Sequence, residues 1–186
     1  VRYIISEEIK FTKVDLSLES LIRVSMKNNP DVLNALSTRY NAERSYEVSK
    51  RALNIVFEQL LLNRVMLEGI VLKPNMIISG LDCNEQADID KVADMTYKCL
   101  KENVPSEVPG IAFLSGGQSS DLATLHLQKM NEKYKHEMPW NLTFSYGRAL
   151  QHDALNSWKG VDVENGQKSF LNRARANSLA TLGQAI

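Results

Sequence analysis

One lysine stands at the end of an apolar run, where an amine could do chemistry. Residues 65–72 are mostly apolar or β-branched, and Lys73 and Pro74 follow them directly. This pattern predicts a buried strand over 65–72 that delivers Lys73 to its C-terminal end. Proline cannot donate to a strand ladder and disfavours helix at the preceding residue, so we expect Lys73 to be extended. Its amine is then either a solvated strand-end charge or a desolvated nucleophile.

Two later apolar runs are each followed by residues that suit a phosphate group. Ser115-Gly116-Gly117-Gln118 follows the run 108–114, and its small residues and backbone N–H groups can form an anion-binding nest before a helix. Gly147-Arg148 follows the run 140–146 and offers close backbone approach and a guanidinium fork. Taken singly, the first motif is more often a plain turn, and the second a glycine bend beside a surface arginine.

Helical periodicity alternates with these three runs. Apolar spacing predicts helices over 42–64, over 88–102, from Ser119 or Ser120 onward, over about 148–158 and over 163–181. In the third of these helices we expect apolar positions to include Leu122, Leu125 and Met130. The order β-loop-α therefore occurs three times, with strand starts about 30 to 45 residues apart. This spacing is typical of βαβ units around a parallel sheet.

The first part of the chain is less regular. Tyr3-Ile4-Ile5 is a possible strand, and residues 17–41 have a mostly helical pattern that Pro30 is expected to break. No strand pattern is convincing between residues 28 and 64.

The C-terminal ends of parallel strands are where α/β folds bind their ligands. In (β/α)8 barrels the loops after strands seven and eight frequently bind phosphate. If the runs 108–114 and 140–146 are those two strands, Lys73 projects from the strand before them toward the same pocket. An amine beside a phosphate site indicates imine formation with a phosphorylated carbonyl compound, in which the protonated imine is an electron sink for carbon–carbon cleavage.

Composition excludes several other classes. The 186 residues carry 22 basic and 22 acidic side chains, which argues against a dedicated surface for nucleic acid or for an anionic membrane. No apolar run approaches the ~20 residues that span a bilayer, and the first residues do not resemble a signal peptide. Three scattered histidines and two cysteines have no metal-ligand spacing. We expect free thiols in a reducing compartment, with Cys83 exposed and Cys99 packed in the core.

Four blocks carry a family resemblance: residues 65–76, 108–118, 142–150 and 174–183. In order and spacing they closely resemble the C-terminal half of the class I fructose-1,6-bisphosphate aldolases, from about Arg44 to Gly183. The resemblance implies an α/β fold that is a partial or rearranged (β/α)8 TIM barrel with about three to four βα units. It also implies a single domain over 1–186, with a helical lead-in at 1–43 and the barrel half at 44–186.

The resemblance further implies roles for individual residues. Lys73 matches the Schiff-base lysine of the family, within its Leu-Lys-Pro-Asn-Met block. The other matching positions bind a substrate phosphate or support the loops that bind it: Leu114, Ser115 and Gly116 in one loop, Gly147 and Arg148 in the next, and Ser145 and Tyr146 as supporting residues.

The family reaction is the reversible cleavage of fructose 1,6-bisphosphate to dihydroxyacetone phosphate and glyceraldehyde 3-phosphate in glycolysis and gluconeogenesis. The resemblance implies this lyase activity without a metal or cofactor, a phosphorylated sugar as substrate, a cytoplasmic location and a homo-oligomer, which is a tetramer in the family. Two alternatives stay open: an aldolase-derived binding or assembly protein that is not catalytic, and an imine-forming lyase for another sugar phosphate.

One family block is not found in the sequence. The family carries its acid–base glutamates in a strand that reads Val-Pro-Ile-Val-Glu-Pro-Glu, before the helix that precedes the lysine. Here Tyr40-Asn41 leads straight into that helix, and Glu43, Glu47 and Glu58 are not in such a block. No glutamate is therefore assigned a catalytic role.

Overall fold

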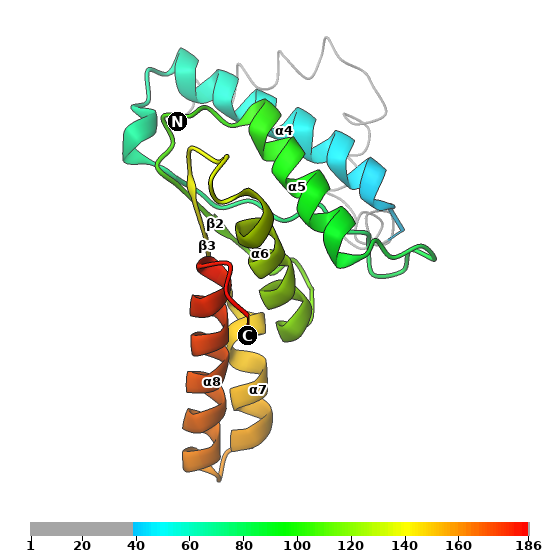
Figure 1. Ribbon diagram of the computed structural model, residues 1–186, viewed down its shortest axis with the longest axis vertical. Coiled ribbons are helices and arrows are strands. Elements are labelled where there is room, and N and C mark those ends of the chain that lie inside the picture. Colours follow the sequence, from blue (N-terminus) through cyan, green and yellow to red (C-terminus); the bar gives the residue numbers. More distant parts are fainter. Residues whose placement is uncertain (1–38, 186) are drawn as a thin grey trace, which may run out of the picture.

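The computed structural model describes residues 39–185, in which helices and short parallel strands alternate (Figure 1). The possible strand at 3–5 and nearly all of the helical pattern at 17–41 lie outside the described residues. The described elements are, in order, α4 (Ala42–Leu62), the 3-10 turn η1 (Leu67–Gly69), β1 (Val71–Leu72), α5 (Ile89–Asn103), β2 (Gly110–Phe113), α6 (Ser120–Tyr134), β3 (Asn141–Phe144), α7 (Arg148–Trp158) and α8 (Val163–Thr181).

The described strands form one parallel sheet in the order β1-β2-β3. Leu72 pairs with Ile111, and Ile111 pairs in turn with Leu142. Because the strands are parallel and each is followed by a helix, all their C-terminal ends meet at one edge of the sheet. The expected α/β fold, a partial (β/α)8 barrel with three βα units, is confirmed.

Side-chain caps fix where several of the helices begin. Asn41, Asp88, Ser119 and Asp162 each accept a hydrogen bond from the backbone N–H three residues later. Each cap satisfies a donor that the first helical turn leaves unpaired. Of the two serines considered as the cap of α6, Ser119 is the one that serves, with its Oγ 3.2 Å from the Leu122 nitrogen.

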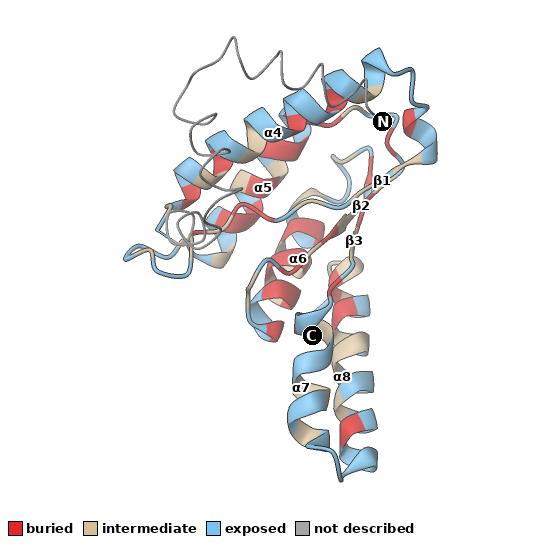
Figure 2. Cartoon of the chain, turned by 180° about the vertical axis from the view of Figure 1, so that it is seen from behind, coloured by how far each residue is buried: buried red, intermediate tan, exposed pale blue. Residues whose placement is uncertain are grey.

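The core lies on one face of the sheet (Figure 2). Alternate strand residues point to opposite faces, and Ile111, Phe113 and Leu142 are buried on the face that α5 and α6 cover. Cys99 of α5 is also buried there, as expected. On the other face, Val71 and Asn141 are exposed. The described sheet is therefore open on one side.

The predicted buried strand over 65–72 is wrong in extent and in burial. Residues 67–69 form a 3-10 turn, because the N–H groups of Gly69 and Ile70 donate to the carbonyl oxygens of Met66 and Leu67, three residues earlier. Extended pairing begins only at Val71, which is 64% exposed because it lies on the open face of the strand at the edge of the described sheet.

Some apolar residues of the predicted helices are exposed. Leu122 of α6 points to solvent, and the buried apolar residues of that helix are Ala123, Leu127 and Met130. On α4, Val56 and Leu61 are likewise exposed. Cys83 is half-buried rather than fully exposed. Apolar type alone does not show which side of a helix faces its neighbour, since that depends on packing.

Arg173 ties the C-terminal hairpin of α7 and α8 to α6. Its guanidinium lies 2.7 Å from an Asp153 oxygen on α7 and 2.6 Å from an Asp121 oxygen on α6. The same group donates to the Thr124 hydroxyl at 3.2 Å. Thr124 in turn lies 2.8 Å from the buried Asn177 side chain of α8. Polar contacts therefore join all three helices at this point.

His126 is a buried titratable group on α6. Its side chain is 4% exposed, and its Nδ1 lies 2.6 Å from the Gln118 Oε1. Burial disfavours the charged imidazolium and lowers the pKa of His126 to about 4. The imidazole is therefore neutral near pH 7 and donates through Nδ1–H, because an amide oxygen only accepts.

The burial of His126 predicts a specific loss of stability in mild acid. The unfolded chain binds a proton at this residue near pH 6.5, whereas the folded chain does so only near pH 4. As the pH falls from 6.5 to 4, the His126 contribution should lower the free energy of unfolding by up to about 3 kcal/mol. Urea unfolding at several pH values should show that His126→Gln removes this part of the pH dependence.

The matched control is His136→Gln, which changes an exposed histidine. This variant should keep the acid sensitivity of the parent chain. A constant difference in unfolding free energy between the parent and His126→Gln from pH 7 to pH 4 would contradict the interpretation.

Candidate active site

Lys73 lies directly after β1 and is exposed. The loop that carries it is joined to the end of β2, because the Leu114 N–H donates to the Pro74 carbonyl oxygen at 3.0 Å. Among the described residues the Lys73 side chain is thus exposed, and the loop that carries it is anchored to the neighbouring strand.

The register of the sheet indicates the face on which Lys73 stands. Leu72 pairs with the buried Ile111, and the next residue in an extended chain points to the opposite face. Lys73 is held extended by the proline that follows it. Its side chain therefore belongs to the open face, level with Ala112 and Thr143 of the neighbouring strands.

The loop after β2 is a tight turn that needs two glycines. Gly116 has φ +57° and Gly117 has φ +83°, and the Gln118 N–H closes the turn onto the Ser115 carbonyl oxygen at 3.0 Å. Two consecutive positive φ values are typical of a type I′ turn and are costly for other residues. Ser115 itself is buried, and α6 begins at Ser120, directly beyond the turn.

The loop after β3 is fixed from both sides. The Ser145 N–H donates to the Phe113 carbonyl oxygen at 2.8 Å, which joins this loop to β2. The next side chain, Tyr146, is buried and donates its hydroxyl to the Ala123 carbonyl oxygen on α6 at 2.8 Å. Burial raises the pKa of Tyr146, so the hydroxyl stays protonated. Gly147 then precedes α7, and the exposed Arg148 is its first residue.

The structure therefore brings the three loops that follow β1, β2 and β3 to one edge of the sheet. Neighbouring strands are about 4.8 Å apart, so the first and third of these loops start about 10 Å apart. An amine, a glycine turn before one helix and an arginine at the start of another are within the span of one small phosphorylated molecule. Such a set can bind an anionic group and form an imine with a nearby carbonyl carbon.

Glu43, in the first turn of α4, is paired outside the candidate site. Glu43 lies 2.6 Å from Lys91 at the start of α5. The hydrogen bond from Lys91 keeps the pKa of Glu43 below its ordinary value. This carboxylate is therefore ionised near neutral pH, which is not the protonated form that a general acid needs.

Sequence reasoning missed the contacts that hold the site loops in place. Gln118 contacts His126 eight residues later, and Tyr146 contacts Ala123 more than twenty residues earlier. The sequence offered one signal for such a contact. His126 lies between the apolar residues Ala123 and Leu127 in the helical pattern, and a polar side chain in that place needs a hydrogen-bond partner. Its partner Gln118 is brought to it by tertiary packing, which residue type does not encode.

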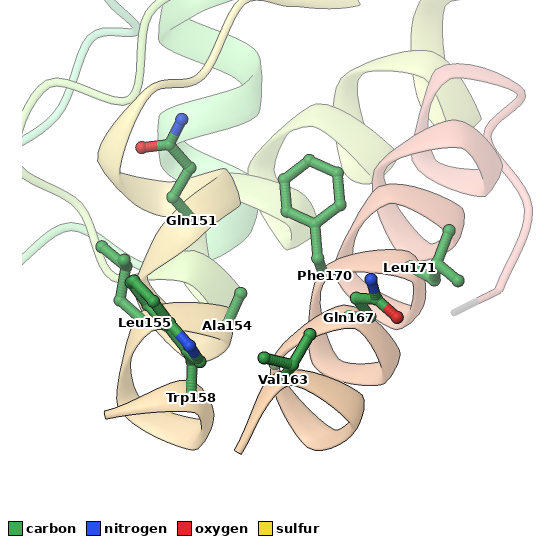
Figure 3. Close-up of a pocket in the computed structure, with 9 residues that line it drawn as sticks. Gln151, Ala154, Leu155, Trp158, Val163, Gln167, Phe170 and Leu171 are labelled. Atoms are coloured by element: carbon green, nitrogen blue, oxygen red, sulfur yellow. The ribbon is translucent and has the colours of Figure 1, made fainter. Parts of the chain in front are cut away.

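An apolar groove of about 570 Å3 lies between α7 and α8 (Figure 3). Leu155 and Trp158 of α7 line it opposite Val163 and Phe170 of α8. It contains no titratable or nucleophilic side chain, so it is not a candidate for catalysis. Within residues 39–185 we find no cluster of three or more metal-ligand side chains. Over the same residues, no helix is both long and apolar enough to cross a membrane.

Comparisons with known proteins agree with the fold and the motifs. The family model "Fructose-bisphosphate aldolase class-I" matches residues 26–185, so the match begins earlier than the motifs indicated. Fructose-bisphosphate aldolase 3, chloroplastic, of Arabidopsis thaliana is 46% identical over 83% of this chain and 39% of its own length. A probable fructose-bisphosphate aldolase class 1 of Xylella fastidiosa is 43% identical over 83% of this chain and 46% of its own length.

A solved structure is also similar. Fructose-bisphosphate aldolase from Plasmodium falciparum, crystallised with TRAP and a small-molecule inhibitor, superposes with a TM-score of 0.73 at 43% identity. The superposition covers 79% of this chain and 42% of that one. The chain thus spans less than half the length of these relatives. It belongs to the class I fructose-bisphosphate aldolase family.

Proposed function

We propose that this chain supplies the Schiff-base lysine and a phosphate-binding site of a fructose 1,6-bisphosphate aldolase. The observation that supports this most is that Lys73, the Ser115-Gly116 turn and Gly147-Arg148 follow three neighbouring parallel strands. Family membership supports this reaction, and the loops carry an amine and groups that can bind a phosphate.

In the proposed mechanism, the neutral Lys73 amine attacks the C2 carbonyl carbon of the substrate. With uptake of one proton, the carbonyl oxygen leaves as water and a protonated imine remains. The C3–C4 bond then breaks, its electron pair moves into the imine to form an enamine, and the C4 hydroxyl loses its proton as glyceraldehyde 3-phosphate departs. Protonation of the enamine at C3 and addition of water release dihydroxyacetone phosphate and restore the amine.

The phosphate is proposed to bind between the second and third loops. Backbone N–H groups at Leu114, Ser115 and Gly116, the Ser115 hydroxyl, and Gly147 with the Arg148 guanidinium are its proposed partners. Ser145 and Tyr146 support the third loop. The α6 and α7 N-termini add a favourable field for an anion at this edge.

The proton transfers are not assigned to a residue of this chain. This favours a second candidate, a protein that binds phosphorylated ligands without turnover, because the family's glutamate block is not found and Glu43 is paired with Lys91. A general acid–base group is typically worth a factor of 10²–10⁴, so imine formation without cleavage would fit this candidate.

A homo-oligomer is the partner that we propose in addition to the sugar phosphate. Several exposed apolar residues of α4 support it, among them Val48, Ile55, Val56 and Leu62. A light-scattering mass that stays at the 21.0 kDa of one chain at all concentrations would refute it. A cytoplasmic location remains a proposal, because some relatives are named as chloroplastic.

Lys73 should form the covalent intermediate. Incubation with dihydroxyacetone phosphate and borohydride should reduce the imine to a stable secondary amine on Lys73. Peptide mass spectrometry should locate the adduct, and Lys73→Met should abolish it because no other group replaces the nucleophile.

The control for this experiment is Lys135→Met. Lys135 is an exposed amine at the far end of α6, ~22 Å from the strand ends. That variant should be labelled like the parent chain. An adduct that survives in Lys73→Met would refute the assignment.

Arg148 should contribute to phosphate binding rather than to the chemistry. Arg148→Ala should raise the concentration of dihydroxyacetone phosphate for half-maximal trapping by about 10–100-fold, as expected for a lost charge-assisted hydrogen bond. The trapped yield at saturation should stay the same. Lys135→Ala, which removes a cation at the opposite edge, should change neither quantity, and an unchanged midpoint in Arg148→Ala would show that the phosphate lies elsewhere.

A further inference from the structure

Gln118 makes more contacts than a turn residue needs. Its backbone N–H and its side-chain Nε2 both donate to the Ser115 carbonyl oxygen, at 3.0 and 2.8 Å. The same Nε2 lies 3.6 Å from the sulfur of Met76, which follows Lys73 by three residues. The side-chain oxygen accepts from His126 at 2.6 Å. One amide group thus contacts the loop after β1, the loop after β2 and helix α6.

The Ser115 carbonyl oxygen fixes which way this amide faces. A carbonyl oxygen can only accept, so the NH₂ group must face Ser115, and the amide oxygen then faces His126, whose Nδ1–H donates to it. His126 is buried on the packed side of α6, so its ring is held in place. Gln118 therefore has a single orientation in which all its polar atoms are paired.

Holding the Ser115 carbonyl has a geometric effect on the next N–H group. The peptide bond between Ser115 and Gly116 is trans, since the described chain has no cis peptide bond. In a trans peptide the C=O and the N–H point in opposite directions. When two donors hold the Ser115 oxygen toward Gln118, the Gly116 N–H must point away from Gln118.

Glycine is what makes this restraint necessary. Gly116 and Gly117 adopt positive φ, and glycine has many other conformations of similar energy. A Ser-Gly-Gly segment that nothing held would rotate its peptide planes easily. The hydrogen bonds of Gln118 remove that freedom before any ligand arrives, which lowers the entropy cost of binding.

We propose that Gln118, held by His126, is a positioning residue that aims the Gly116 N–H at the substrate phosphate. The inference rests on the proposed phosphate site and adds a residue that does not itself touch the ligand. It assigns Gln118 to phosphate affinity, not to the reactivity of the Lys73 amine.

The test compares trapping of two ketones on Lys73 by borohydride. Dihydroxyacetone phosphate carries the group that the turn would bind, and dihydroxyacetone lacks it. Gln118→Met keeps the length of the side chain but removes both side-chain donors and the acceptor. It should raise the half-maximal concentration of dihydroxyacetone phosphate about tenfold. Trapping of dihydroxyacetone should not change.

Two further variants separate positioning from general damage. Gln128→Met makes the same substitution on α6, outside the turn, and should behave like the parent chain with both ketones. Gln118→Met combined with His126→Leu removes both partners of the buried hydrogen bond, which limits the cost to stability. This double variant should show the same tenfold defect as Gln118→Met alone.

Equal losses with both ketones, or no loss with either, would overturn the role of Gln118. If the parent chain is labelled by neither ketone, the proposed Schiff-base function fails, and a phosphorus NMR titration with inorganic phosphate tests Gln118 separately. In that titration, about tenfold weaker binding by Gln118→Met supports the inference, and equal binding or no binding by the parent overturns it.

Discussion

Parallel pairing of β2 with a strand on each side is the constraint on which the rest of the structure depends. It places three C-terminal strand ends at one edge and leaves their order no freedom. Two backbone hydrogen bonds, from Leu114 to Pro74 and from Ser145 to Phe113, extend the pairing into the loops themselves. The candidate site is thus an extension of the sheet, because backbone hydrogen bonds join its loops to the neighbouring strands.

The one-sided core explains how so few paired residues can hold this edge. Ile111, Phe113 and Leu142 pack under α5 and α6, and those helices begin where the site loops end. The same packing that buries the strands therefore also positions the helix N-termini. Polar contacts then refine the loops: Tyr146 reaches the backbone of α6, and Gln118 reaches His126 on the same helix. Helix α6 is the common support of two of the three loops.

Much of this arrangement could be predicted from the sequence, because the spacing of apolar residues and the residues that begin or end helices are local signals. The helix predicted over 148–158 is α7, the one predicted over 163–181 is α8, and the helix predicted from Ser119 or Ser120 onward is α6, with Ser119 as its cap. The strand predicted over 65–72 is wrong because residues 67–69, which include Glu68 and Gly69, form a 3-10 turn. The apolar residues on either side of this turn hide it in the sequence pattern. Leu122 is exposed although it is apolar, because the elements that pack against α6 determine which side of the helix is buried. The roles of Lys73, Arg148 and the serine turn remain predictions that residue type and strand order support.

Among the described residues, strand β1 pairs on one side only and over two residues, which makes the local stability of the candidate site uneven. Edge strands with few ladder bonds and exposed side chains open more readily than segments packed on a helix. The proposed nucleophile is carried by such a segment, whereas both proposed phosphate loops are hydrogen-bonded to α6. Transient fraying of β1 would therefore displace the Lys73 amine while the proposed phosphate loops kept their shape, so the two halves of the candidate site differ in rigidity although one sheet carries both.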